Sequence, residues 1–243
     1  MRSLIPLMTS FYSGNIILIV AAVVPAFFLL RFIYKHDRLE PESHSMIGRL
    51  VLMGIISTFI AVMCERLGVL ILDAIFNEAT VLYRFILYFF IVGLSEEAAK
   101  YAVLNKSTWM SPEFNCKFDG VVYAVTISLG FALWENIQYV LMYGLTTALV
   151  RSITAVPGHA CFGVFMGVWY GLAKRSQLRG DAEMEKTCKR LCVAMPMVIH
   201  GCYDFIASMT NAYATIIFVV FVAVMFIISY SMVKKLSAND EYL

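Results

Sequence analysis

Residues 212–233 read AYATIIFVVFVAVMFIISYSMV and carry no charged side chain. A helix of about 20 apolar residues crosses the hydrocarbon core of a bilayer, so this stretch predicts a membrane span. Similar apolar blocks lie upstream, at residues 13–34, 47–75, 82–105, 118–145, 149–173 and 189–209. We therefore predict an all-α fold, a polytopic transmembrane helical bundle of about seven spans.

The composition of the whole chain agrees with this prediction. Its 243 residues are 60% hydrophobic and 15% charged, with a mean hydropathy of +0.77. Soluble domains have about 45–50% apolar and about 25% charged residues, so too little polar surface remains here to coat a water-soluble particle. We exclude a soluble α/β enzyme, a disulfide scaffold, a disordered chain and a nucleic-acid binder. The expected surroundings are the lipid bilayer of a cell membrane, crossed several times.

The placement of lysine and arginine predicts the orientation. Of the 19 such residues, 15 fall on one side of the seven spans and Arg66 lies inside the second span. The other side receives only Arg2, Arg84 and Arg151. Cytoplasmic loops are enriched in lysine and arginine, so we expect the N-terminus outside and the C-terminus in the cytoplasm. The largest polar loop, roughly residues 173–190, is too short to fold alone. We therefore expect one integral-membrane domain, residues 1–243.

Ionisable side chains inside membrane spans are costly and are functional candidates by default. Four successive spans carry them: Glu96, Glu97 and Lys100 in GLSEEAAKY, Glu135 beside Asn136 in FALWENIQY, His159 in PGHACFG, and His200 with Asp204 in HGCYD. A purely structural polar core is the alternative for this set. For Lys100 alone the alternative is a lysine that snorkels to the interface, and for Glu65 and Arg66 in the second span we favour a structural role.

Helical spacing places some of these residues on common faces. Residues four apart on a helix lie about 40° apart, so Glu96 and Lys100 can meet, as can His200 and Asp204. A carboxylate beside an imidazole orients the ring and selects its tautomer. Phe131 shares a face with Glu135. Two adjacent carboxylates in a low dielectric cannot both ionise comfortably, which favours a general base that works near neutral pH.

The motifs on these spans together resemble those of the PrsW intramembrane proteases. They are E-E-A-A-K at 96–100, F-A-L-W-E at 131–135, H-A-x-F-G at 159–163 and H-G-C-Y-D at 200–204, preceded by a D-x-x-E-P-E element at 37–42. The family belongs to a larger clan with the CAAX prenyl endopeptidases and bacteriocin-immunity-type membrane proteins. The resemblance runs from about residue 34 to residue 204, and with it we expect a catalytic core at about 82–209.

The resemblance implies proteolysis of a single-span membrane protein such as an anti-sigma factor, cut on its extracytoplasmic side as the first step of sigma-factor release. It implies that Glu96 activates water, that Glu97 holds or tunes it, and that His159 and His200 polarise the peptide carbonyl. Lys100, Phe131, Glu135, Asn136 and Asp204 are then supporting and positioning residues. Glu135 departs from the wider clan, because the prenyl endopeptidases have a histidine at that place.

Three alternatives stay open at this point. A zinc site made by Glu96, His159 and His200 would acidify water directly, but a glutamate pair suffices for hydrolysis and we favour a protease without metal. A proton- or ion-coupled transporter would use the same carboxylates and imidazoles as a relay. A non-catalytic relative would only bind a partner.

Overall fold

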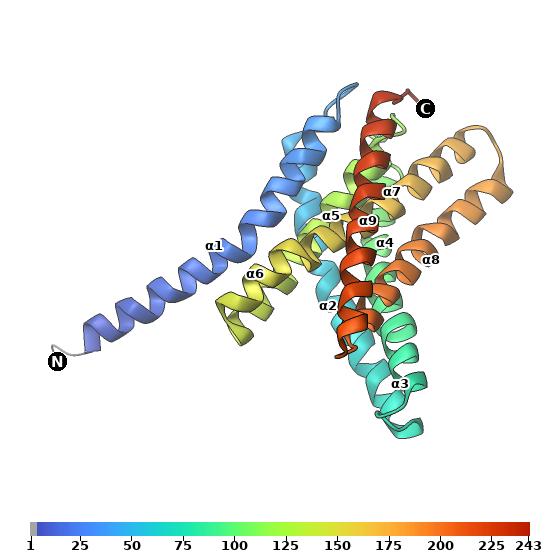
Figure 1. The fold of residues 1–243 in the computed structure, drawn as a ribbon. Helices are drawn as coiled ribbons and strands as arrows, with labels where there is room; N and C mark the ends of the chain where they lie inside the picture. The colour runs from blue at the N-terminus through green and yellow to red at the C-terminus, as the bar shows by residue number, and fades with distance from the viewer. Residues whose placement is uncertain (1–3) are drawn as a thin grey trace.

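The structure is a computed structural model that describes the backbone of residues 4–243 and the side chains of residues 18–243 other than Ala148. Arg2 lies outside the described residues. Figure 1 shows a bundle of helices that run back and forth between two ends. The elements are α1 (Leu4–His36), α2 (His44–Ile75), α3 (Val81–Ile86), the π-helical η1 (Leu87–Gly93), α4 (Leu94–Thr108), α5 (Asp119–Tyr143), α6 (Leu145–Ile153), α7 (Ala155–Leu178), α8 (Ala182–Ala207) and α9 (Ala212–Ala238).

The all-α membrane fold is confirmed. Six helical stretches among the described residues are long and apolar enough to cross a membrane: Leu18–His36, His44–Ile75, Asp119–Tyr143, Leu145–Leu178, Ala182–Ala207 and Ala212–Ala238. The expected third span is also helical, as the unbroken run α3–η1–α4, but it is not one of the six. Its π-helical segment divides it into short elements, and its last part carries Glu96, Glu97 and Lys100.

Two features of the helices differ from the sequence-based expectation. The expected fifth span, 149–173, is interrupted at Thr154, where the short helix α6 ends and α7 begins. The expected polar loop at 173–190 is mostly helix, because α7 continues to Leu178 and α8 starts at Ala182. The side chain of Asp181 accepts a hydrogen bond from the backbone N–H of Met184, 3.0 Å away, and so caps the start of α8.

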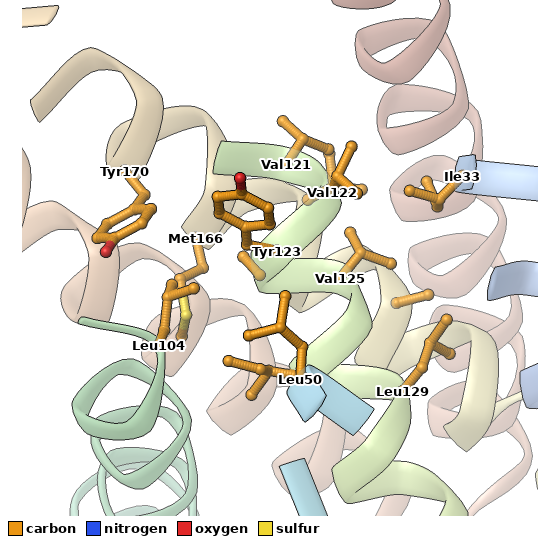
Figure 2. Packing of buried hydrophobic residues seen from close by; sticks show 14 of the residues in the cluster. Ile33, Leu50, Leu104, Val121, Val122, Tyr123, Val125, Leu129, Met166 and Tyr170 are labelled. Atoms are coloured by element: carbon orange, nitrogen blue, oxygen red, sulfur yellow. The ribbon is translucent and has the colours of Figure 1, made fainter. Parts of the chain in front are cut away.

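Helix α5 lies at the centre of the bundle, and every residue from Asp119 to Ala132 is buried. Figure 2 shows its apolar side chains packed against residues from four other helices: Ile33, Leu50, Leu104, Met166 and Tyr170. Without a hydrophobic force between helices in lipid, close packing of small residues drives their association. The α5–α7 contact has this character. A Cβ atom built on Gly167 would lie 2.5 Å from the carbonyl oxygen of Gly120.

The loops that carry the predicted cytoplasmic charges meet at one end of the bundle (Figure 1). The hydroxyl of Tyr123 on α5 donates to Glu42 in the α1–α2 loop at 2.5 Å. Near the C-terminus, Tyr242 forms an isolated antiparallel bridge with Cys116 in the loop before α5, and Glu241 pairs with Arg175 of α7 at 3.2 Å. We call this the basic end of the bundle. The distribution of lysine and arginine predicts that this end faces the cytoplasm.

Candidate active site

The paired glutamates lie in the first turn of α4, directly after the π-helical segment. Single π-helical turns inside α-helices are rare and concentrate at functional sites. Here η1 packs closely on α8, because a Cβ on Gly93 would lie 3.1 Å from the carbonyl oxygen of Met197, and one on Gly201 would lie 2.6 Å from the ring of Phe89. This close approach brings the backbone at His200 next to the paired glutamates.

Lys100 contacts three of the ionisable residues of the site. Its Nζ lies 2.7 Å from Oε1 of Glu97, 3.2 Å from Oε2 of Glu96 and 3.1 Å from Nδ1 of His159. The ammonium also lies 4.1 Å from the ring centroid of Phe131, a cation–π contact. Because the side chain of Lys100 is fully buried, the snorkelling alternative is wrong. The lysine instead balances the charge of two buried carboxylates.

His200 is held between two carboxylates. Its Nδ1 lies 3.0 Å from Oε1 of Glu97, and its Nε2 lies 3.3 Å from Oδ2 of Asp204 one turn later on α8. The expected pairing of His200 with Asp204 on one helix face is therefore present. The ring of Phe162 stacks on the imidazole with centroids 4.6 Å apart, which fixes its plane.

His159 is held in a similar way from the other side. Its Nε2 lies 2.9 Å from Oε2 of Glu135, while its Nδ1 faces the ammonium of Lys100. An ammonium has only donors, so Nδ1 of His159 accepts and Nε2–H donates to Glu135. Each histidine thus has its Nδ1 anchored to the buried Glu97–Lys100 pair.

Both histidines line a shared cavity of about 340 Å³. Of the predicted residues, Glu96, Phe131, Glu135, His159, His200 and Asp204 line it. Among the described residues Glu97 and Lys100 lie behind this lining, and Asn136 is buried beyond Glu135, where it donates to the carbonyl oxygen of Ala22 on α1 at 3.0 Å. The paired glutamates therefore differ in position, since Glu96 faces the cavity and Glu97 faces Lys100 and His200.

Two residues at the cavity were not selected from the sequence. Glu65 on α2 lines it, although a structural role was favoured for this residue. Arg151, expected only as a charge on the outer side, also lines it and lies 2.8 Å from Oε2 of Glu135. The signal for Glu65 was present, because it is an acid at membrane depth. Arg151 lies at the start of the predicted fifth span, where an arginine is ordinarily a charge at the membrane surface. The sequence therefore did not single it out.

A metal ion would need several donor atoms around one point. Of the described residues, Glu96, Glu97 and His159 each place one donor atom within 4.8 Å of the others. This group differs from the expected trio, because it contains Glu97 in place of His200. The ammonium of Lys100 lies against all three of its members.

Comparison with known proteins identifies the family. The sequence profile described as "PrsW family intramembrane metalloprotease" matches residues 41–230. Protease PrsW of Oceanobacillus iheyensis is 31% identical over 219 residues, which cover 90% of this chain and 95% of that protein. Protease PrsW of Bacillus subtilis is 30% identical over 192 residues, covering 79% and 83%. The chain belongs to the PrsW protease family.

Membership in the PrsW family establishes a multi-pass membrane protease and confirms the resemblance inferred from the motifs. The matched region contains every residue of the cavity named above. Protease PrsW of Geobacillus kaustophilus is similarly related, at 32% identity over 189 residues, 78% of this chain and 79% of that protein. No solved structure matches the chain significantly.

Proposed function

We propose that this PrsW family member is a glutamate-type endopeptidase in which Glu96 is the general base. The observation that carries the proposal is the difference between the paired glutamates. Glu96 lines the cavity, whereas Glu97 is fully buried between Lys100 and His200. A general base must reach the proton that it removes, so Glu96 has the geometry for this role and Glu97 does not.

In this mechanism Glu96 takes a proton from a water molecule in the cavity as the water oxygen adds to the scissile carbonyl carbon. The carbonyl oxygen becomes an oxyanion, which accepts hydrogen bonds from Nε2–H of His159 and of His200. Both atoms already point toward cavity-lining carboxylates, and the His200–Asp204 contact is long at 3.3 Å. A substrate oxygen takes the place of these carboxylates, as catalytic hydrogen bonds tighten only in the complex. Glu96 then returns its proton to the amide nitrogen, the C–N bond breaks, and an acid and an amine leave.

The neighbours of these three residues orient them and balance their charge. Glu97 anchors Nδ1 of His200, and Lys100 anchors Nδ1 of His159 while it balances the charge of both glutamates. The ring of Phe131 covers the ammonium and shields it from water. We assign these as positioning residues.

The donor set at Glu96, Glu97 and His159 does not fit a metal ion in this arrangement. The space between the three donor atoms is taken by a fully buried ammonium, which contacts each of them at 3.2 Å or less. A cation of higher charge would have to displace Lys100 into apolar surroundings beside Phe131, where a free ammonium is costly. This supports hydrolysis by Glu96 without a metal.

We propose a single-span membrane protein, such as an anti-sigma factor, as the substrate. The support is the family resemblance together with a polar cavity enclosed by helices that cross the membrane. Its volume of about 340 Å³ lies within the range of ligand pockets, about 300–1,000 Å³.

The test is co-expression of the full chain with a tagged single-span anti-sigma factor. The wild type shortens the substrate, and Glu96→Gln leaves it at full length because an amide cannot take the proton. Glu183→Gln, an exposed glutamate at the start of α8, is the matched control and cuts like the wild type. A transporter or a binding protein would leave the substrate uncut in every case. Cutting by Glu96→Gln at the wild-type rate would refute the role of Glu96.

A further inference from the structure

The start of α8 carries a cluster of basic side chains that the proposed catalytic site does not use. Helices α7 and α8 extend together to a turn at residues 179–181 (Figure 1). The first turn of α8 is acidic, and Lys186, Lys189 and Arg190 follow on the next two turns. Along α8, Arg190 lies about 15 Å from His200 on the side predicted to be cytoplasmic, which is half the thickness of the hydrocarbon core. We therefore expect the cluster at the level of the inner lipid headgroups.

The three cations line a hollow between α8 and α4. Its volume is about 470 Å³, and Tyr101 of α4 completes the lining together with Ala182 and Glu185 of α8. Tyr101 is half-buried, and its ring lies edge-on to that of Tyr170 with 6.3 Å between the centroids. We call this the α4–α8 hollow. It combines side chains from two helices that are far apart in the sequence.

The α4–α8 hollow carries an excess of positive charge. Nζ of Lys189 lies 2.7 Å from Oε1 of Glu185 and 3.8 Å from the ring centroid of Trp109, so this ammonium already has partners. Lys186 and Arg190 are exposed, and no ion pair among the described residues involves either of them. Two cations are therefore left unpaired around one concave surface. A phosphate is complementary to them, because its oxygen atoms accept charge-assisted hydrogen bonds from both an ammonium and a guanidinium.

The surroundings of the α4–α8 hollow favour a phosphate that belongs to a lipid. Leu94 precedes Tyr101 by two helical turns on the same face of α4 and is 38% exposed. On α8, Val198 is 46% exposed and lies outward of the cations. Exposed apolar side chains thus follow the basic hollow outward along both helices. Basic pockets between transmembrane helices on the cytoplasmic side bind anionic lipid headgroups, and the apolar side chains give acyl chains a surface.

We propose that the α4–α8 hollow binds one anionic phospholipid of the cytoplasmic leaflet. Its phosphate lies against Lys186 and Arg190, with the hydroxyl of Tyr101 as a further donor, and its acyl chains lie along α4 and α8. The inference does not depend on the function proposed for the cavity. The lipid joins α4 to α8, the helices that carry Glu97 and His200, whose Oε1 and Nδ1 atoms lie 3.0 Å apart. It therefore stabilises the packing of these two helices.

Native mass spectrometry of the full chain in detergent tests the proposal. The probes are phosphatidylglycerol as the anionic lipid, phosphatidylcholine as the zwitterionic lipid, and glycerol phosphate as a headgroup without acyl chains. We expect one phosphatidylglycerol to bind saturably, at least tenfold more tightly than phosphatidylcholine, and to stay bound in the presence of an equal concentration of glycerol phosphate. Added salt should weaken this preference, because salt screens exposed charges. Equal affinity for the two lipids, or displacement by glycerol phosphate, would overturn the inference.

Substitutions locate the lipid on the protein. In the double variant Lys186→Gln/Arg190→Gln the affinity for phosphatidylglycerol should fall at least tenfold, and in Tyr101→Phe it should fall by a smaller factor. Lys234→Gln/Lys235→Gln is the matched control, because it removes the same charge from the exposed end of α9, and it should bind like the wild type. Equal losses in the two double variants would overturn the inference. The single variants Lys186→Gln and Arg190→Gln, each expected to lose part of the affinity, keep the question answerable if the double variant folds poorly.

Thermal unfolding in detergent gives a second measurement. A ligand that binds only the folded protein raises its unfolding temperature. Added phosphatidylglycerol should therefore stabilise the wild type and the Lys234→Gln/Lys235→Gln control, but not Lys186→Gln/Arg190→Gln. Equal stabilisation of all three proteins would contradict the site. An acidic peptide is the other possible occupant, and hexaglutamate is its probe. If the Lys186→Gln/Arg190→Gln variant loses hexaglutamate but keeps phosphatidylglycerol, the hollow binds a peptide and the lipid assignment is wrong.

Discussion

Nζ of Lys100 lies 3.1 Å from Nδ1 of His159, although 59 positions separate the two residues in the sequence. This contact joins α4 to α7 and connects the acidic half of the site to its imidazoles. The lysine contacts Glu97, Glu96 and His159 together while it is fully buried. A single ammonium therefore sets both the charge balance of the glutamates and the orientation of one histidine.

Lys100→Met is expected to abolish cleavage and to destabilise the protein. The substitution keeps an apolar stem but leaves two buried carboxylates without their cation, and breaking a buried ion pair in this way costs about 3–5 kcal/mol. Lys106→Met, on the exposed side of the same helix, is the matched control and should behave as the wild type. Substrate cleavage and thermal unfolding in detergent measure the two effects. A Lys100→Met protein that cuts at the wild-type rate would contradict the role assigned to this residue.

Removal of metal ions is expected to leave activity unchanged. The proposed base is a glutamate, and the space between Glu96, Glu97 and His159 is filled by an ammonium. Purified protein is treated with a chelator, its zinc content is measured, and cleavage is compared before treatment, after treatment and after added zinc. Complete loss on chelation with specific recovery by zinc would show that Lys100 gives way to a metal in the active enzyme.

Much of this site was predictable because membrane burial makes polar residues informative. The acids and histidines of four spans stood out against apolar surroundings, and the structure brings Glu96, His159 and His200 to one cavity. The relative depths of these residues in the membrane were not predictable from the sequence. Hydropathy does not report a π-helical segment before Glu96 or a helix break at Thr154, and both change where side chains point.

The position of Arg151 shows the same limit of sequence-based prediction. An arginine near a span boundary is ordinarily a charge at the membrane surface. Only the turn at Gly144, where φ is +81°, separates α6 from α5 and lets the arginine point back toward Glu135. Such a reversal depends on backbone geometry that a hydropathy pattern does not contain.

Gly167→Ala is expected to destabilise the bundle. The new methyl group would lie 2.5 Å from the carbonyl oxygen of Gly120, so α5 and α7 must separate, and overpacking of this kind typically costs about 1–3 kcal/mol. Gly48→Ala is the same substitution in α2, where the added atom meets nothing within 4 Å. It should be neutral or stabilising by up to about 1 kcal/mol, because alanine favours helix. Unfolding midpoints in detergent compare the two, and equal midpoints would contradict the close-packed α5–α7 contact.

Asp37, just beyond α1 at the basic end, should make stability depend on pH. Burial raises the pKa of Asp37 to about 6, even though its Oδ2 accepts a hydrogen bond from the backbone N–H of Glu42 at 2.9 Å. Burial likewise raises the pKa of Glu42 to about 7. The folded protein therefore binds these protons more tightly than the unfolded chain, in which an aspartate has a pKa near 3.8. Stability from Asp37 is present in full below that value and is lost as the pH rises through 6.

The wild type should consequently unfold at a lower temperature at pH 8 than at pH 5. Asp37→Asn resembles the protonated acid at every pH, so the difference between the two pH values should shrink, with the remainder due to the other acids at this end whose pKa is raised by burial, which include Glu42 and Asp240. Glu183→Gln, an exposed acid of α8, serves as the control and should keep the full wild-type difference. Thermal unfolding in detergent at both pH values provides the measurement. If Asp37→Asn loses as much stability as the wild type between pH 5 and pH 8, Asp37 is not a titrating group in this range.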